Sequence, residues 1–268
     1  MVTRRDNELW SWSAIDLARA IATRAISSRE AVQSSLDRIA AVNPALNAVV
    51  EVLADEALAA ADAADAKVKS GAELGTLHGV PVTIKVNVDQ RGHATTNGVV
   101  AFRDVIATED SPVVANVRKA GAIIVGRTNT PAFSHRWFTN NDLHGATHNP
   151  WSRRLTPGGS SGGAASAVAS GMGAIAHGND FGGSIRAAAL AMGGDWHDLG
   201  GSLSNSAEDS VSLQPLARIG DAAERAWAAE WVTAILAKEG VTIDPTAKEH
   251  VWSALTSLAS SPVEERTI

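Results

Sequence analysis

Two glycine-rich loops carry the serines best suited to nucleophilic chemistry in this chain. Residues 156–163 read TPGGSSGG, so Ser160 and Ser161 lie between two pairs of glycines. Residues 180–186 read DFGGSIR, so Ser184 directly follows two further glycines. Because glycine has no Cβ, such loops let backbone N–H groups and small hydroxyls crowd around a reacting group. Several N–H groups in one turn suit the stabilisation of a developing oxyanion.

Two other interpretations of the first loop fit the sequence less well. A phosphate-binding loop of the Walker type ends in Gly-Lys-Ser/Thr, and no lysine follows Gly163. A flexible linker is not expected to lead straight into residues 164–173, an Ala-rich stretch that predicts a helix between buried strands. We therefore interpret the loop as a place where a serine takes part in the chemistry.

A serine nucleophile needs a base, and Lys85 is the candidate. The eight histidines show no recognisable Ser/His/Asp pattern. Lys85 lies within VTIKVNV (82–88), and apolar neighbours lower the pKa of a lysine by desolvation. With an ordinary pKa of ~10.4, only ~4 lysines in 10,000 are neutral at pH 7, so the base must be buried. Without the serine loops, Lys85 would be interpreted as a lysine on an edge strand.

The arrangement of these segments resembles the amidase signature family, whose serine amidases use a Ser–cis-Ser–Lys triad. The similar segments are GVPVTIKVN (79–87), GRTNTPAFS (126–134), HNPWS (148–152), TPGGSSGGAAS (156–166) and NDFGGSIR (179–186). The spacings are similar as well: Ser160 follows Lys85 by 75 positions, and Ser184 follows Ser160 by 24. The resemblance extends over most of residues 10–186.

The resemblance implies a division of roles among these residues. Ser184 would be the nucleophile that forms an acyl-enzyme, Ser160 on a cis peptide bond would relay the proton, and neutral Lys85 would be the terminal base. The N–H groups of four consecutive residues would form the oxyanion hole: Phe181, Gly182, Gly183 and Ser184. Four further residues would support the loops: Gly159, Ser161, Asp180 and Arg186.

The chain also departs from the family pattern. Val86 and Ala132 stand where acidic residues are usual, and Ala188 stands where a proline is usual. Family members are considerably longer, and the segment that normally follows Arg186 is not recognisable here. The resemblance therefore implies an amidase signature fold that is shortened and incomplete after the Ser-Ile-Arg run.

Three functions stay open at this point. The first, favoured because all three triad positions are present, is an amide hydrolase that acts on a small or aryl amide. The second is a transamidation subunit that takes ammonia from glutamine for a partner. The third is an inactive, shortened family member that serves as a binding or assembly module. Ser134 and the nearby aromatic residues indicate an aromatic-tolerant substrate pocket, although core packing explains the aromatics equally well: Phe133, Trp137 and Phe138.

The elements that must position these residues alternate along the chain. Apolar, β-branched runs at 79–88, 122–129 and 174–180 predict strands, and stretches at 112–121 and 164–173 predict helices. This pattern indicates an α/β fold, with a mixed sheet covered by helices on both faces.

Three regions are predicted within one structural domain. Residues 1–75 form an N-terminal helical layer, residues 76–189 the α/β catalytic core, and residues 190–268 a loop followed by C-terminal helices. In the first region a capping box at Ser27 starts a helix that Asn43-Pro44 ends, and Gly71 ends the next helix.

Composition limits the classes of partner. Apolar residues make up 45% of the 268 positions and the formal net charge is −6, so we expect a globular protein that binds no nucleic acid. There is no cysteine, no secretory signal and no membrane-length apolar run, so a cytoplasmic location is expected. No cofactor and no metal are expected, because the clustered histidines lack a carboxylate at a known spacing: His135, His144 and His148. The expected partner is a small-molecule amide, with a homo-oligomer left open.

Overall fold

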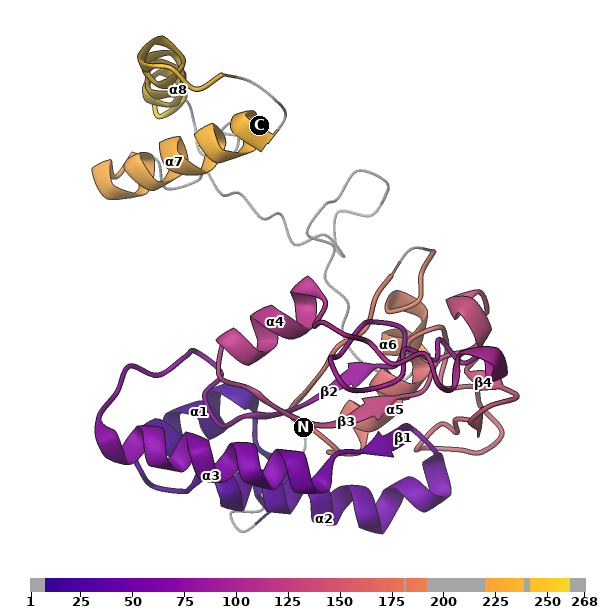
Figure 1. Ribbon diagram of the computed structural model, residues 1–268. Coiled ribbons are helices and arrows are strands. Elements are labelled where there is room, and N and C mark those ends of the chain that lie inside the picture. The colour runs from indigo at the N-terminus through magenta and orange to yellow at the C-terminus, as the bar shows by residue number, and fades with distance from the viewer. Residues whose placement is uncertain (1–7, 181, 192–219, 239–241, 261–268) are drawn as a thin grey trace. The chain divides into compact units, whose positions relative to one another are not determined.

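The computed structural model describes residues 8–180, 182–191, 220–238 and 242–260. The chain divides into two compact units, Met1–Trp196 and His197–Ile268. Figure 1 shows the elements of each unit. Lys85, Ser160 and Ser184 lie in the first unit. The prediction of three regions within one structural domain stays a prediction.

A mixed four-stranded sheet forms the centre of the first unit. Its strands are β1 (Val49–Val52), β2 (Pro81–Lys85), β3 (Ile123–Thr128) and β6 (Ile175–Ala176), in the order β1-β3-β2-β6. β2 runs parallel to β3 and β6, whereas β1 runs antiparallel to β3. Lys85 pairs with Thr128 at the carboxyl end of β2. The predicted α/β fold with a mixed sheet is confirmed.

The predictions were correct for the two central strands of the sheet. They were too long for the edge strand β6 and missed the edge strand β1. The strands predicted at 79–88 and 122–129 are present as β2 and β3. Of residues 174–180 only Ile175–Ala176 form a strand. The N-terminal layer predicted as helical also contains a strand, β1, because Val49, Glu51 and Val52 pair with β3 after the left-handed Asn47.

Helices cover both faces of the sheet. The helices of the first unit are α1 (Ala14–Ala22), α2 (Ser28–Leu46), α3 (Ala54–Ser70), α4 (Pro112–Lys119), α5 (Gly162–Ala169) and α6 (Arg186–Ala191). Neighbouring residues of β3 point to opposite faces, as the pleat requires. Ile124 packs into an apolar cluster that includes Val114 of α4. Ile123 packs into a second cluster that includes Leu36 of α2 and Ala167 of α5.

Most helix boundaries follow the capping residues. The capping box of Ser27 and Glu30 is present at the start of α2, and Gly71 ends α3 in the left-handed conformation. The predicted end of α2 at Asn43-Pro44 was wrong, since the helix continues through Pro44 to Leu46. Pro44 has no backbone N–H, so near its end the helix loses one hydrogen bond. The Asn43 side chain binds the backbone at Ala48 and at Val49 of the next strand.

The remaining elements are short or belong to the second unit. They are η1 (Leu9–Ser11), η2 (Val100–Phe102), η3 (Ala132–Ser134) and the hairpin of β4 (Asn140–Asn141) with β5 (Gly145–Ala146). In the second unit α7 (Ala222–Lys238) packs on α8 (Pro245–Leu258) around Ala228, Val251 and Leu255. No helix among the described residues has the length and apolarity needed to cross a membrane.

Candidate active site

Lys85 is the last residue of β2 and is completely buried. Every residue of that strand is buried, so the Lys85 side chain is shielded from solvent. Burial lowers the pKa of Lys85 from 10.5 to about 7, and the nearby Asp180 carboxylate opposes this shift. The lowered pKa agrees with the prediction made from its apolar neighbours.

A continuous chain of hydrogen bonds joins Lys85 to both glycine-rich loops. Lys85 Nζ donates to Ser160 Oγ at 2.7 Å, and Ser160 Oγ donates to Ser184 Oγ at 2.9 Å. Ser160 and Ser184 are both buried, and the peptide bond between Gly159 and Ser160 is cis. The structure therefore brings together the three residues that the sequence singled out from positions far apart in the chain.

Close backbone packing explains the glycine next to this serine. A Cβ at Gly159 would lie 2.6 Å from the backbone nitrogen of Phe138 and 2.7 Å from the carbonyl oxygen of Arg136. Real Cβ atoms do not approach backbone atoms so closely, so a larger residue would force this loop or the backbone at Arg136 and Phe138 to shift. The supporting role predicted for Gly159 thus has a steric basis.

Two further oxygen atoms surround the amine. Lys85 Nζ also donates to Asn179 Oδ1 at 2.7 Å and to Ser161 Oγ at 3.1 Å. Ser161 Oγ donates to the carbonyl oxygen of Asn179 at 3.0 Å, which links the two glycine-rich loops. Sequence reasoning gave Ser161 a supporting role but missed Asn179. The available signal was a polar residue at the end of a strand, immediately before the predicted Asp180.

The loop that carries Ser184 is shaped by Asp180. Its carboxylate accepts hydrogen bonds from the N–H of Gly183 at 2.6 Å and of Ile185 at 3.0 Å. The N–H of Gly183, predicted as an oxyanion donor, is therefore occupied by a carboxylate in this structure. Phe181 and the side chain of Arg186 lie outside the described residues.

A cavity of about 370 Å³ opens onto the serines. Its lining includes Ser160, Asn179, Gly182 and Ser184 from the triad loops. The opposite wall comes from residues 133–137, among them the predicted Ser134.

The side chains of that wall differ in their contacts and exposure. The Ser134 hydroxyl accepts from Asn87 Nδ2 at 3.0 Å and lies 3.0 Å from Thr130 Oγ1, so it belongs to a fixed polar network. Phe133 and Trp137 line the cavity and are largely exposed. Phe138, predicted beside them, instead lies under the guanidinium of Arg136.

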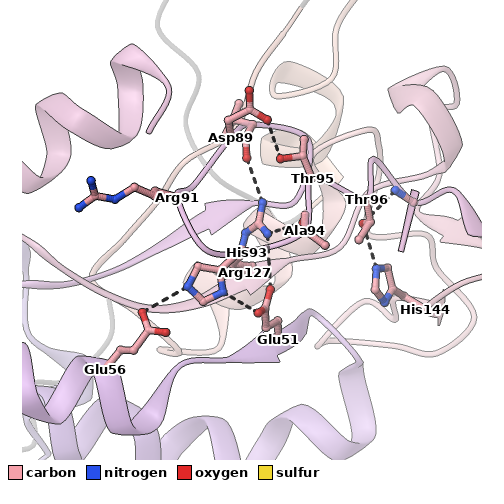
Figure 2. Close-up of polar contacts among 12 residues, drawn as sticks. Glu51, Glu56, Asp89, Arg91, His93, Ala94, Thr95, Thr96, Arg127 and His144 are labelled. Atoms are coloured by element: carbon pink, nitrogen blue, oxygen red, sulfur yellow. Dashed lines mark hydrogen bonds and ion pairs between the residues drawn. The ribbon is translucent and has the colours of Figure 1, made fainter. Parts of the chain in front are cut away.

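The N-terminal layer holds the loop that follows Lys85. His93 approaches Glu51 of β1 at 2.7 Å and Glu56 of α3 at 3.2 Å with its two ring nitrogens (Figure 2). Buried Arg127 lies 3.5 Å from the other Glu51 oxygen and donates to the carbonyl oxygen of Val88 at 2.9 Å. Sequence reasoning missed this network because its members come from four separate segments.

The described residues contain no group of three or more His, Asp or Glu placed to hold a metal ion. His144 is instead 3.1 Å from Thr96 Oγ1 (Figure 2), and burial lowers its pKa.

Comparison with known families agrees with the geometry. The family described as "Amidase" matches residues 30–192, which is more than half of the chain. The chain belongs to the amidase signature family. Among its relatives, an indoleacetamide hydrolase of Bradyrhizobium diazoefficiens is 61% identical over 178 residues, covering 66% of this chain and 34% of that protein.

Other relatives have different names. A glutamyl-tRNA(Gln) amidotransferase subunit of Acidothermus cellulolyticus is 45% identical over 68% of this chain and 36% of its own length. Among solved structures of the family, a bacterial aryl acylamidase superimposes with a TM-score of 0.65 at 36% identity, covering 66% of this chain and 37% of that one. The chain therefore spans about a third of the length of the relatives it matches.

Proposed function

We propose that this chain is an amide hydrolase that acts through Ser184, Ser160 and Lys85. The observation that carries the proposal is the unbroken hydrogen-bond chain from Lys85 Nζ through Ser160 Oγ to Ser184 Oγ. A serine hydroxyl is a weak nucleophile until a base removes its proton, and this chain provides a path for that proton.

The proposed reaction has two halves. Ser184 Oγ attacks the amide carbonyl while its proton passes to Ser160 Oγ and the Ser160 proton passes to Lys85 Nζ. The tetrahedral intermediate then collapses, the C–N bond breaks, and the amine leaves with the proton returned along the same path. Water attacks the resulting ester in the same way, which releases the carboxylic acid and regenerates Ser184.

The environment of Lys85 suits it to act as the base. A pKa of about 7 leaves a large fraction of the amines neutral at neutral pH. This fraction is roughly three orders of magnitude above that of an ordinary lysine. A neutral amine has two N–H groups and one lone pair. Ser161 Oγ and Asn179 Oδ1 are placed to accept the two N–H groups, which turns the lone pair toward Ser160.

An amide with an aromatic acyl group is the proposed substrate class. Phe133 and Trp137 line the cavity beside Ser184, and aromatic side chains bind aromatic groups by stacking and edge contacts. The name of one relative, indoleacetamide hydrolase, supports the same class, and the name aryl acylamidase supports an amide that contains an aryl group. The amidotransferase relative supports a second candidate, ammonia release from glutamine for a partner protein.

A substrate comparison tests the proposal. Purified chain is incubated with indole-3-acetamide, phenylacetamide and glutamine, and released ammonia is measured. We expect release from the aryl amides, none from glutamine, and at least a thousandfold loss in Ser184→Ala, with Ser170→Ala as the matched serine control. Release from glutamine alone would favour the transamidation function. No release from any amide would favour the inactive binding module.

A further inference from the structure

The cavity wall formed by residues 133–137 is fixed at both ends. At one end the Ser134 hydroxyl accepts a hydrogen bond from Asn87 Nδ2 at 3.0 Å. At the other end, two positions beyond the wall, Thr139 Oγ1 donates to the carbonyl oxygen of Gly158 at 3.0 Å. The residues between these two anchors therefore have a set position beside the loop that carries the first serine of the proposed triad.

Arg136 lies within this wall, and its backbone contacts the same loop. A Cβ on Gly159 would lie 2.7 Å from the Arg136 carbonyl oxygen, so the two backbones pack directly against each other. The Arg136 side chain is exposed and lines the cavity together with Ser184. Its guanidinium lies 5.5 Å from the centre of the Phe138 ring. Because that ring offers no oxygen acceptor, the N–H donors of the guanidinium remain available to a ligand.

The charge of Arg136 has no acidic partner among the described residues. Asp180 is the one acid among the described residues that line the cavity. Its carboxylate already accepts from the backbone N–H groups of Gly183 and Ile185. An arginine side chain stays protonated at every physiological pH. The cavity therefore presents a permanent positive charge beside Ser184, and that charge suits an anionic group on a ligand.

We propose that Arg136 makes the cavity selective for aryl amides that carry a carboxylate. The proposal rests on the amide hydrolysis proposed above and narrows its substrate class. A guanidinium matches the planar carboxylate with two parallel N–H donors. Phe133 and Trp137, which flank Arg136 in the wall, contact the aromatic group. Arg136 binds a substituent rather than the reacting bond, so it is a residue of specificity.

The carboxylate belongs either to the amine part of the amide or to its acyl part. In an N-acyl amino acid it departs with the amine, whereas in a carboxylated aryl acetamide it stays with the acyl group. The bonds that form and break at Ser184 are the same in both cases. The shared chemistry is therefore an anion held by Arg136, and paired ligands separate the two sources.

Equilibrium binding to the Ser184→Ala chain tests the proposal without turnover. Two ligand pairs differ in charge and little in shape: phenylacetylglycine with phenylacetylglycinamide, and 4-carboxyphenylacetamide with 4-carbamoylphenylacetamide. Titration calorimetry at neutral pH measures each Kd. We expect the anionic member of at least one pair to bind about tenfold more tightly than its neutral partner. The pair that shows this preference identifies the part of the amide that carries the carboxylate.

Three further variants, each made in the Ser184→Ala chain, assign the preference to one side chain. Arg136→Gln should abolish it, because the amide side chain carries no charge. Arg136→Lys should keep part of it, because the charge remains and the two parallel donors are lost. Arg19→Gln changes an exposed arginine of α1 and is the matched control, which should keep the full preference. Circular dichroism establishes that each variant remains folded.

Equal binding of the two members in both pairs would overturn the proposal, and so would the absence of binding by either anion. A preference that Arg136→Gln leaves unchanged would overturn it as well. Failure of the proposed amide hydrolysis has a different sign, which is the absence of ammonia release from every amide. The two failures are therefore distinguishable.

Discussion

At the scale of single residues, the amine of Lys85 is surrounded by three oxygen atoms at the end of an apolar strand. Its lowered pKa affects both activity and stability, and both change in the same direction with pH. The neutral form, which is the proposed base, increases as the pH rises through about 7. At Lys85 the folded protein also binds fewer protons than the unfolded chain. Burial of Lys85 therefore lowers the stability of the fold below the unfolded pKa, and this loss is largest below a pH of about 7.

We therefore expect activity and stability to rise together from acid to mildly alkaline pH. Lys85→Met removes the titrating amine while keeping an unbranched side chain. It should lower kcat by about 10²–10⁴-fold. It should also raise stability more at pH 6 than at pH 9, which urea unfolding at the two pH values measures. An equal change in stability at both pH values would contradict the lowered pKa.

The neighbour Asn179 should set the position of the pH–rate profile. In Asn179→Asp a carboxylate replaces the amide whose oxygen lies 2.7 Å from Lys85 Nζ. A negative charge there favours the protonated amine, so the pKa of Lys85 should rise and the profile should shift to higher pH. Asn179→Ser, which adds no charge, is the control. If the two variants gave the same profile, Asn179 would not act through the amine.

At the scale of elements, two structures fix the segments that carry the proposed triad: the turn from Asp180 to Ile185, which carries Ser184, and the network around His93, which binds the loop after Lys85. The turn depends on one carboxylate that accepts two backbone N–H groups. The network joins β1 and α3 to the loop after β2 through Glu51, Glu56 and Arg127 (Figure 2).

Asp180→Asn tests the turn, because asparagine has nearly the same side-chain shape as aspartate but no charge. A neutral amide oxygen is a weaker acceptor than a carboxylate, so the turn should loosen and kcat should fall at least tenfold. The remaining activity should extend to lower pH, because the charge that raises the pKa of Lys85 is gone. A pH–rate series on both proteins measures the two effects. A profile that moved to higher pH would contradict the assigned influence of Asp180.

His93→Ala tests the network. Each ring nitrogen of His93 faces a carboxylate oxygen, and loss of both contacts should lower the free energy of unfolding by about 1–3 kcal/mol. His93→Gln, which can keep one of the contacts, should lose less. Chemical denaturation of the three proteins decides the point, and equal stability of all three would show that the network contributes nothing measurable.

The sequence predicted the parts of this arrangement that depend on local chemistry. The capping box at Ser27, the buried strands β2 and β3 and the lysine between apolar neighbours each depend on a short run of consecutive residues. β1 and the His93 network were missed because both depend on pairing between distant segments. Asn179 was missed because nothing in its own neighbourhood shows that Lys85 Nζ would reach it.

At the scale of the whole molecule, the described residues place the proposed triad beside a cavity with exposed aromatic side chains. The chain covers about a third of its relatives, yet the described residues contain the full hydrogen-bond chain from Lys85 to Ser184. Trp137, which lines the cavity, is 74% exposed. The proposed nucleophile can therefore be tested with a reagent that does not depend on the substrate cavity.

Labelling with a fluorophosphonate tests the central claim most directly, because the reagent needs an activated serine but no shaped substrate pocket. The chain is treated at pH 8, digested, and the modified residue is located by mass spectrometry. The account predicts one adduct on Ser184, with a rate at least a hundredfold lower in Lys85→Met and unchanged in Ser170→Ala. An unlabelled Ser184, or labelling as fast without Lys85, would contradict it.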